Sequence, residues 1–213
     1  MPKTISKIIK VLIASDFFLN LGWGLLSPVF ALFILEKITL DNPVKAAQVA
    51  GFAALAYWIS KSFIEIPIGR YLDKHDGEKD DFWFMAIGLF VVAFVPIGYL
   101  FSTQAWHIYV FQVLHAVGMA MALPSWLAIF TRHIDKGKEA FEWSMETTSI
   151  GVGAGIAGGL GGVMASMLGF KALFLFVSGL TIISAFLYLF IRKDVSPRGG
   201  RSEPSMERPV VEP

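Results

Sequence analysis

The sequence contains no cysteine and little charge, and both absences narrow what the protein can do. Without cysteine the chain forms no disulfide, offers no thiolate nucleophile and cannot hold a metal through cysteine sulfur. Charged residues make up only 16% of the 213 positions and hydrophobic residues 55%, which is too apolar for an ordinary soluble domain. The charges lie in short clusters between long uncharged runs, so a basic stripe for nucleic acid is also missing. This pattern indicates a membrane protein.

Motifs that would indicate catalysis or cofactor binding are absent as well. The sequence has no Gly-x-Ser-x-Gly elbow, no His-Glu-x-x-His motif and no Gly-rich phosphate loop ending in Lys-Ser or Lys-Thr. Four histidines occur without the spacing of a metal site: His75, His107, His115 and His133. We therefore predict no enzyme, no cofactor and no metal. Any transport is expected to use a gradient rather than ATP.

Six stretches reach the ~20 mostly apolar residues that a membrane-crossing helix needs. They lie near 8–35, 46–72, 82–101, 106–131, 144–168 and 170–192. The first is too long for a cleavable signal sequence and carries polar residues within it. We predict an all-α membrane protein with a six-helix transmembrane domain over 1–193. The remainder, 194–213, is rich in Pro, Gly, Ser and charge, which predicts a disordered cytoplasmic tail.

The distribution of basic residues predicts the orientation of these helices. Most of the 18 Lys and Arg residues fall on the side of the membrane that holds both chain ends. The opposite side has only three: Lys37, Lys45 and Lys171. Because cytoplasmic loops are enriched in Lys and Arg, both termini are predicted to lie in the cytoplasm of a multi-pass protein of the inner or plasma membrane. Aromatic residues near helix ends are expected to act as interface anchors: Trp83, Tyr99 and Trp106.

Polar residues within the first stretch form one helix face. They recur at steps of three and four positions: Asp16, Asn20, Trp23 and Ser27. An ionisable group in the hydrocarbon region is costly, so Asp16 is a candidate for substrate or proton binding. Two interpretations of Asp16 are open. It is either a proton-binding carboxylate or a carboxylate that stays ionised through a bond to Lys61 or Asn20.

Other intramembrane polar residues have similarly divided interpretations. Lys61 and Glu65 have the i, i+4 spacing of an ion pair, and they either contact substrate or neutralise one another so that the helix inserts. Gln112 and His115 share a face of the fourth stretch, where His115 either binds substrate or a proton or packs through a hydrogen bond. Glu146 is a candidate too, although an acid also favours the start of a helix.

The loop after the second stretch reads GRYLDKHDGEK. It resembles the cytoplasmic signature between helices 2 and 3 of the major facilitator superfamily, in which Gly and three residues precede Asp, a basic residue, Gly and further basic residues. Here one extra residue precedes the second Gly. The resemblance implies a conformational latch in which the Asp faces a helix N-terminus of the other half. Lys74 and Lys79 also serve topology. The latch residues are Gly69, Asp73, Lys74, Gly77 and Lys79.

A second resemblance to the same family lies in the fifth stretch, where GAGIAGGLGG is followed by GFKALFLF. Ala157 and Gly158 stand where family members often have Gly-Pro, which weakens an inference of antiport. Small residues at this spacing also allow close helix packing, which is our preferred interpretation. The predicted packing residues are Gly153, Gly158, Gly161 and Gly162.

The family resemblance implies one six-helix half of the N-terminal type, built as a 3+3 inverted repeat. Two copies inserted in the same orientation can pair around a central cavity, because the halves of the family are related by an axis along the membrane normal. The resemblance also implies that the first helix lines this cavity, which makes its whole polar face, from Asp16 to Ser27, a candidate for substrate contact. The expectation is a half-size secondary active transporter. It would move a small solute across the lipid bilayer by alternating access as a homodimer, and proton coupling is open. The alternative is half of a split transporter, or a non-transporting membrane subunit, that needs a different partner.

Overall fold

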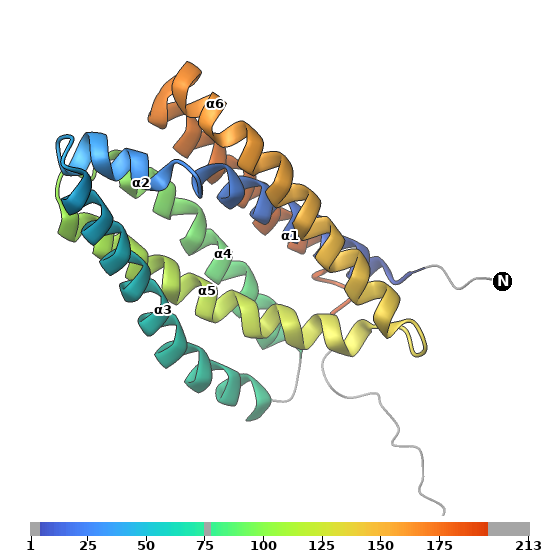
Figure 1. Ribbon diagram of the computed structural model, residues 1–213. Helices are drawn as coiled ribbons and strands as arrows, with labels where there is room; N and C mark the ends of the chain where they lie inside the picture. Colours follow the sequence, from blue (N-terminus) through green and yellow to red (C-terminus); the bar gives the residue numbers. More distant parts are fainter. Residues whose placement is uncertain (1–4, 75–77, 196–213) are drawn as a thin grey trace, which may run out of the picture.

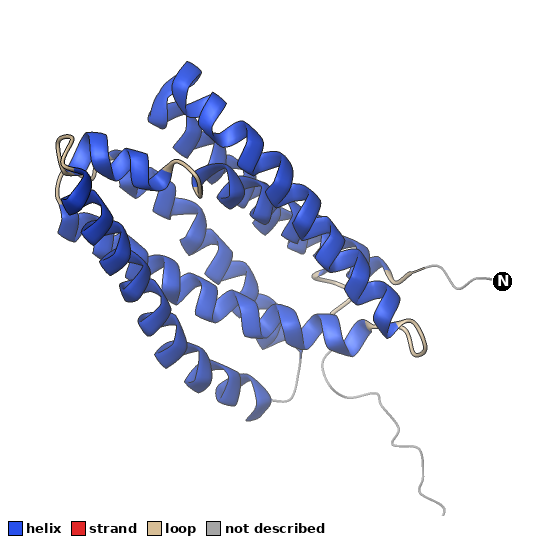
Figure 2. Cartoon of the chain, in the orientation of Figure 1, coloured by secondary structure: helices blue, strands red, loops and turns tan. Residues whose placement is uncertain are grey.

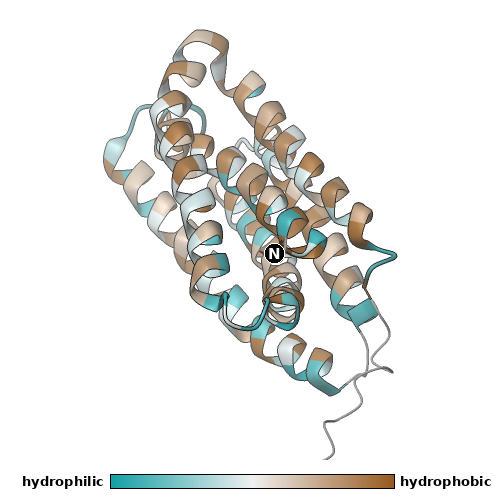
Figure 3. Ribbon diagram, turned by 90° about the vertical axis from the view of Figure 1, so that its right-hand side faces the viewer, coloured by the Kyte–Doolittle hydropathy of each residue, from teal (hydrophilic) through white to brown (hydrophobic). Residues whose placement is uncertain are grey.

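The computed structural model describes residues 5–74 and 78–195, and in this part of the chain every regular element is a helix (Figure 2). The elements are α1 (Lys7–Leu26), α2 (Phe30–Phe33), the π-helix η1 (Ile34–Ile38), α3 (Pro43–Lys74), α4 (Glu78–Leu100), α5 (Ala105–His133), α6 (Glu139–Tyr188) and the 3₁₀ turn η2 (Leu189–Ile191). Among these described residues, 5 helices are long and apolar enough to cross a membrane. In Figure 3, residues coloured brown as hydrophobic recur along the helices.

Helix α6 contains two of the six predicted spans. Its backbone leaves helical geometry at Gly169, where φ is 75° and ψ is 167°, a conformation that glycine adopts without a Cβ penalty. Figure 1 shows the chain turning back within α6, at the top of the view. The helix therefore consists of a first arm (139–168) and a second arm (170–188), which correspond to the predicted fifth and sixth spans.

The first predicted span, 8–35, is not one continuous helix, so that prediction is wrong. Helix α1 ends at Leu26, because the following Pro28 has no N–H to donate to the helical ladder. The chain turns over Ser27 to Val29, whose N–H donates to the Leu26 carbonyl at 3.1 Å, and then resumes as α2 and η1. The part of this stretch that crosses the bundle is consequently α1 alone.

Helix α1 packs against both arms of α6, which flank it in Figure 1. On the first arm, the approach is so close that a Cβ added at Gly24 would lie 2.8 Å from the Ala157 Cβ. On the second arm, the buried Ser15 hydroxyl donates to the Ser184 carbonyl at 2.8 Å. Small residues and paired hydroxyls thus replace large apolar side chains where these helices meet.

Helices α4 and α5 form the other closely packed pair. A Cβ added at Gly118 would lie 2.7 Å from the Gly88 carbonyl oxygen. Tyr99, near the end of α4, is 0% exposed, so its prediction as an interface anchor is wrong, whereas Trp106 at the start of α5 is 56% exposed. Tyr99 lies inside because Phe30 and Phe174 pack against its ring.

Helix α3 lies at the edge of the bundle and packs mainly on α5 (Figure 1). Its outward face is apolar and strongly exposed, with Phe63 77% and Trp58 60% exposed. An apolar exposed face of this kind suits lipid or a second membrane helix rather than water. Because α3 lies at the edge, it is the outermost helix over the polar residues Gln112 and His115 of α5.

Candidate functional site

Two acidic side chains face each other in the middle of the bundle. Asp16 lies on α1 and Glu146 on the first arm of α6, and their carboxyl groups are close enough to interact directly. Glu146 is only 2% exposed. Asn20, one turn along α1, donates to the Asp16 backbone carbonyl at 2.9 Å and to its carboxylate at 3.3 Å. We call Asp16 and Glu146 the acid pair.

Among the described residues, no cation forms an ion pair with either acid. Neither carboxyl oxygen of Glu146 receives a hydrogen bond from an N–H or hydroxyl group of the described residues. The other titratable group that interacts with both acids is Tyr188, a fully buried phenol on the second arm of α6. Lys61 bonds to Glu65 instead of Asp16. Two adjacent buried carboxylates repel, and a proton held between them removes that repulsion.

A cavity of about 340 Å³ lies at the opposite end of α1 from Lys7. Six of its lining residues have rings, and we call it the aromatic cavity: Trp23, Phe30, Tyr57, Trp58, Tyr99 and His115. The Trp23 and His115 rings stack with centroids 3.9 Å apart and planes 14° from parallel. The Tyr57 ring lies 4.7 Å from that of His115. Gln112 and Ser27 add polar groups to the wall.

Lys61 and Glu65 form an ion pair on α3, with 2.7 Å between the Lys61 Nζ and a Glu65 carboxylate oxygen. The Lys61 nitrogen also lies 5.8 Å from the centre of the Trp58 ring, a cation–π distance. Glu65 lines a second cavity of about 430 Å³ together with Ser62, near Pro124 of α5. The ion pair thus lies between the aromatic cavity and this second cavity.

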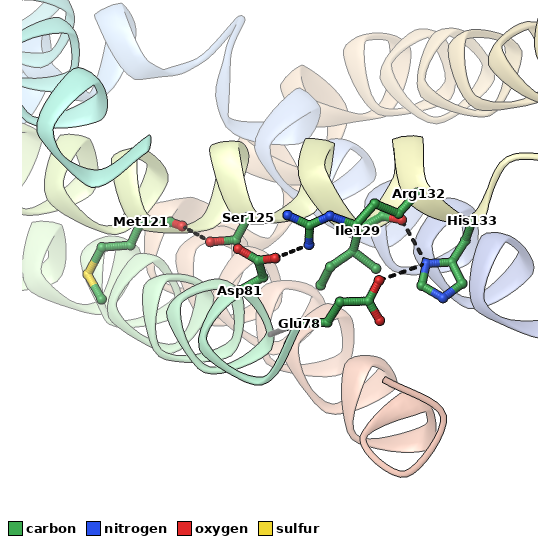
Figure 4. A network of polar contacts seen from close by, with 7 residues as sticks. All are labelled: Glu78, Asp81, Met121, Ser125, Ile129, Arg132 and His133. Atoms are coloured by element: carbon green, nitrogen blue, oxygen red, sulfur yellow. Dashed lines mark hydrogen bonds and ion pairs between the residues drawn. The ribbon is translucent and has the colours of Figure 1, made fainter. Parts of the chain in front are cut away.

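Ion pairs also join helix ends where α4 begins and α5 ends, at the end of the bundle that carries Lys7, which we call the basic end. Figure 4 shows the pairs there. Arg132 of α5 donates to the carboxylate of Asp81, which is 1% exposed. His133 Nδ1 lies 3.7 Å from a Glu78 carboxylate oxygen and 2.9 Å from the Ile129 carbonyl. The Arg132–Asp81 ion pair and the His133–Glu78 contact therefore tie α4 to α5.

The described residues of the predicted latch lie at the basic end. Asp73 and Lys74 are exposed in the last turn of α3, and Lys79 is exposed in the first turn of α4. Within residues 5–74 and 78–195, Asp73 makes no ion pair. Gly69 is half-buried, and Gly77 lies outside the described residues. The role of these residues as a latch stays a prediction.

The four glycines predicted for packing lie on two faces of the first arm of α6. Gly153 and Gly161 face α1, where added Cβ atoms would meet Phe17 and Leu25. Gly158 and Gly162 face outward, and an added Cβ would meet nothing within 4 Å among the described residues. Gly155 lies on the same outward face, whereas the exposed Leu160 lies on a different side of this arm.

The structure brings most predicted site residues into two groups. Asp16 and Glu146 form the acid pair, with Asn20 bonded to Asp16. Four residues line the aromatic cavity: Trp23, Ser27, Gln112 and His115. Sequence reasoning missed Tyr57, although it lies one helical turn before Lys61 and the i, i+4 spacing could have found it. It also missed Tyr99 and Tyr188, because nothing local in the sequence distinguishes a buried tyrosine from an interfacial one.

The family model described as Major Facilitator Superfamily matches residues 12–212. No curated protein matches the chain.

Proposed function

Because the chain belongs to the Major Facilitator Superfamily, whose members are membrane transporters, we propose that it is a proton-coupled secondary transporter that works as a homodimer. The transported species would be a small solute, bound between the two copies and released by alternating access. The basic end would face the cytoplasm, with both termini on that side of the inner or plasma membrane.

The observation that carries proton coupling is the acid pair. Glu146 is buried without a hydrogen-bond donor among the described residues, and the ionisable group it faces is another acid. One proton held between Asp16 and Glu146 satisfies both carboxyl groups, and its loss leaves two negative charges in contact. Because charges within the membrane are costly, protonation and deprotonation would favour different arrangements of α1 against α6.

Self-pairing is supported by the outward face of the first arm of α6. Gly155, Gly158 and Gly162 leave open space on a helix of a membrane protein, where small residues let a second helix approach closely. The exposed apolar face of α3 provides a second surface that a partner copy would contact. In a dimer with two-fold symmetry, these surfaces of both copies would enclose a common cavity.

The dimer is tested by a matched pair of substitutions on one helix. Gly158→Leu places a large side chain on the outward face and is expected to convert dimer to monomer in native mass spectrometry from nanodiscs. Leu160→Ala, which shortens an exposed neighbour, is expected to leave the dimer intact. A wild-type protein that is monomeric in lipid would overturn self-pairing.

Alternating access is testable because the chain has no cysteine of its own. Ser27→Cys reports on the aromatic cavity and Ser62→Cys on the second cavity. We expect a change of pH to alter the rates of labelling by an impermeant maleimide at the two positions in opposite directions. Asp16→Asn should abolish this reciprocal change. Rates that are independent of pH at both positions would contradict proton-coupled alternating access.

The second candidate is half of a split transporter, or a subunit without transport activity of its own. The exposed face of α3 fits a different six-helix chain as well as a second copy. Obligate co-purification of a different membrane protein from native membranes, with a monomeric chain when it is expressed alone, would favour this candidate.

A further inference from the structure

The aromatic cavity indicates the chemical class of the solute. We propose that the chain binds an uncharged aromatic compound of one or two rings, with at least one hydrogen-bonding group, in the cavity lined by Trp23, Tyr57, Trp58, Tyr99 and His115. This inference rests on the proposed function, because it names what such a transporter would carry.

Ring-bearing side chains from five helical segments converge on this cavity, among them Phe30 of α2. Trp23 comes from α1, Tyr57 and Trp58 from α3, Tyr99 from α4 and His115 from α5. The Trp23 and His115 rings are already stacked, and Tyr57 is tilted against the same His115 ring. Rings held in fixed orientations favour a flat ligand ring, which can stack on one wall and meet the edge of another.

Two buried polar atoms on residues of the cavity wall lack a hydrogen-bond partner within residues 5–74 and 78–195. The Tyr99 hydroxyl and the Trp23 indole N–H are buried and have no hydrogen-bond partner among the described residues. Tyr99 is 0% exposed, so the unpaired hydroxyl is costly unless a bound molecule or water pairs with it. A ligand with a hydroxyl or amine group satisfies one or both atoms.

The charges near the cavity favour an uncharged ligand. None of its lining residues is acidic, Lys or Arg. The neighbouring cation, Lys61, is held by Glu65 at 2.7 Å and so has its countercharge already. An anion would lose hydration without gaining a partner. A cation would gain only ring faces, and the Trp58 ring already has the Lys61 nitrogen 5.8 Å from its centre, whereas an uncharged aromatic ligand loses little hydration.

The size and opening of the cavity set the scale of the ligand. Its volume of about 340 Å³ is at the lower end of the range for small-molecule sites, which suits one or two rings. Trp58 is 60% exposed and Ser27 is also exposed, so the cavity has an open side. A solute can therefore enter from that side, and its polar group reaches the buried Tyr99 hydroxyl when the rings around that atom shift.

The test uses the full chain in lipid nanodiscs, labelled with 5-fluorotryptophan and observed by fluorine NMR. The probe is 2-naphthol, which is uncharged at neutral pH and carries one hydroxyl. We expect saturable shifts of the Trp23 and Trp58 signals, assigned through single Trp→Phe variants. The Trp106 signal should not saturate, because that exposed side chain lies outside the cavity and reports only partition into lipid.

Matched probes separate the parts of the proposal. Decahydro-2-naphthol keeps the hydroxyl without the aromatic rings and should bind about 10-fold more weakly. 2-Naphthoate and 2-naphthyltrimethylammonium carry opposite charges, and each should bind at least about 10-fold more weakly than 2-naphthol. Equal binding of the decahydro compound would overturn the aromatic class, and tighter binding of either ion would overturn the uncharged class.

Variants locate the site on this cavity. Tyr99→Phe should weaken 2-naphthol about 5-fold without changing 2-methylnaphthalene, because only the first has a hydroxyl to pair. His115→Leu should weaken both, while Trp106→Leu should change neither. Unaltered Trp126 and Trp143 signals, which come from rings packed on Phe130, verify that each variant is folded. Saturable 2-naphthol binding that survives His115→Leu unchanged would place the site elsewhere and overturn the proposal.

The outcome is independent of the transport test. Reciprocal labelling of Ser27→Cys and Ser62→Cys without saturable 2-naphthol binding would reject the solute class and leave the transporter proposal in place. Saturable 2-naphthol binding without reciprocal labelling would reject the transporter proposal and leave the aromatic binding site in place.

Discussion

At the basic end of the bundle acids face bases, whereas in its middle two acids face each other. Asp81 is held by Arg132 and Glu78 lies beside His133. Asp16 and Glu146 have no such partner among the described residues, although they lie in a more costly environment. Paired charges fix the position of one helix on another. An unpaired acid in the membrane is instead favoured in its protonated form, so the two regions should respond differently to the same kind of substitution.

The largest expected effect is at the basic end. Asp81→Ala should lower the free energy of unfolding by about 3 kcal/mol, because it leaves the largely buried Arg132 guanidinium without its partner. Denaturant unfolding in a mild detergent measures the change. Replacing Arg132 by Met in the same chain should recover most of the loss, since no charge then stays unpaired. A double variant as unstable as Asp81→Ala would contradict this explanation.

A smaller effect is expected at the acid pair. Glu146→Gln should change the free energy of unfolding by less than about 1 kcal/mol, because an amide can donate to the Asp16 carboxylate in place of the shared proton. The same unfolding assay, run beside Asp81→Ala, measures it. A loss as large as that of Asp81→Ala would mean that the acid pair is a structural element like the pairs at the basic end.

The smallest effect is expected at the surface of the basic end. Lys7 and Asp194 are joined at 2.7 Å, but their side chains are 64% and 42% exposed. Lys7→Ala should therefore change the free energy of unfolding by no more than about 0.5 kcal/mol, with less effect in high salt. An effect above about 1 kcal/mol that is insensitive to salt would contradict the view that the exposed Lys7–Asp194 pair contributes less to stability than the buried Asp81–Arg132 pair.

The sequence predicts the helices well because their physical signal is local. Length and apolarity identify α3, α4 and α5 almost to their ends. The break after Leu26 was missed, although Pro28 marks it, since the apolar run continues through the proline. The two arms of α6 were predicted as separate spans because Gly169 and its neighbours interrupt the pattern. The termini, the orientation and the 3+3 repeat stay predictions from charge and family resemblance.

Only part of the candidate site could be predicted from the sequence. Helical spacing placed Asp16, Asn20 and Trp23 on one face of α1, because periodicity within a helix is a property of the sequence. It could not show that Glu146, 130 positions along the chain, would face Asp16. Such pairings depend on how α1 packs against α6. Tyr99 was missed for the same reason, since its burial is produced by neighbours from other segments.

The central claim is that Asp16 and Glu146 share one proton at neutral pH, and infrared difference spectroscopy tests it most directly. The wild-type protein in lipid should show the carbonyl absorption of a protonated carboxyl group at pH 7, shifted in heavy water. The Glu146→Gln spectrum should lack this absorption, because Asp16 in that variant accepts a hydrogen bond from the introduced amide and is ionised. A wild-type spectrum without a protonated carboxyl group at pH 7, or an absorption that Glu146→Gln leaves unchanged, would contradict the account.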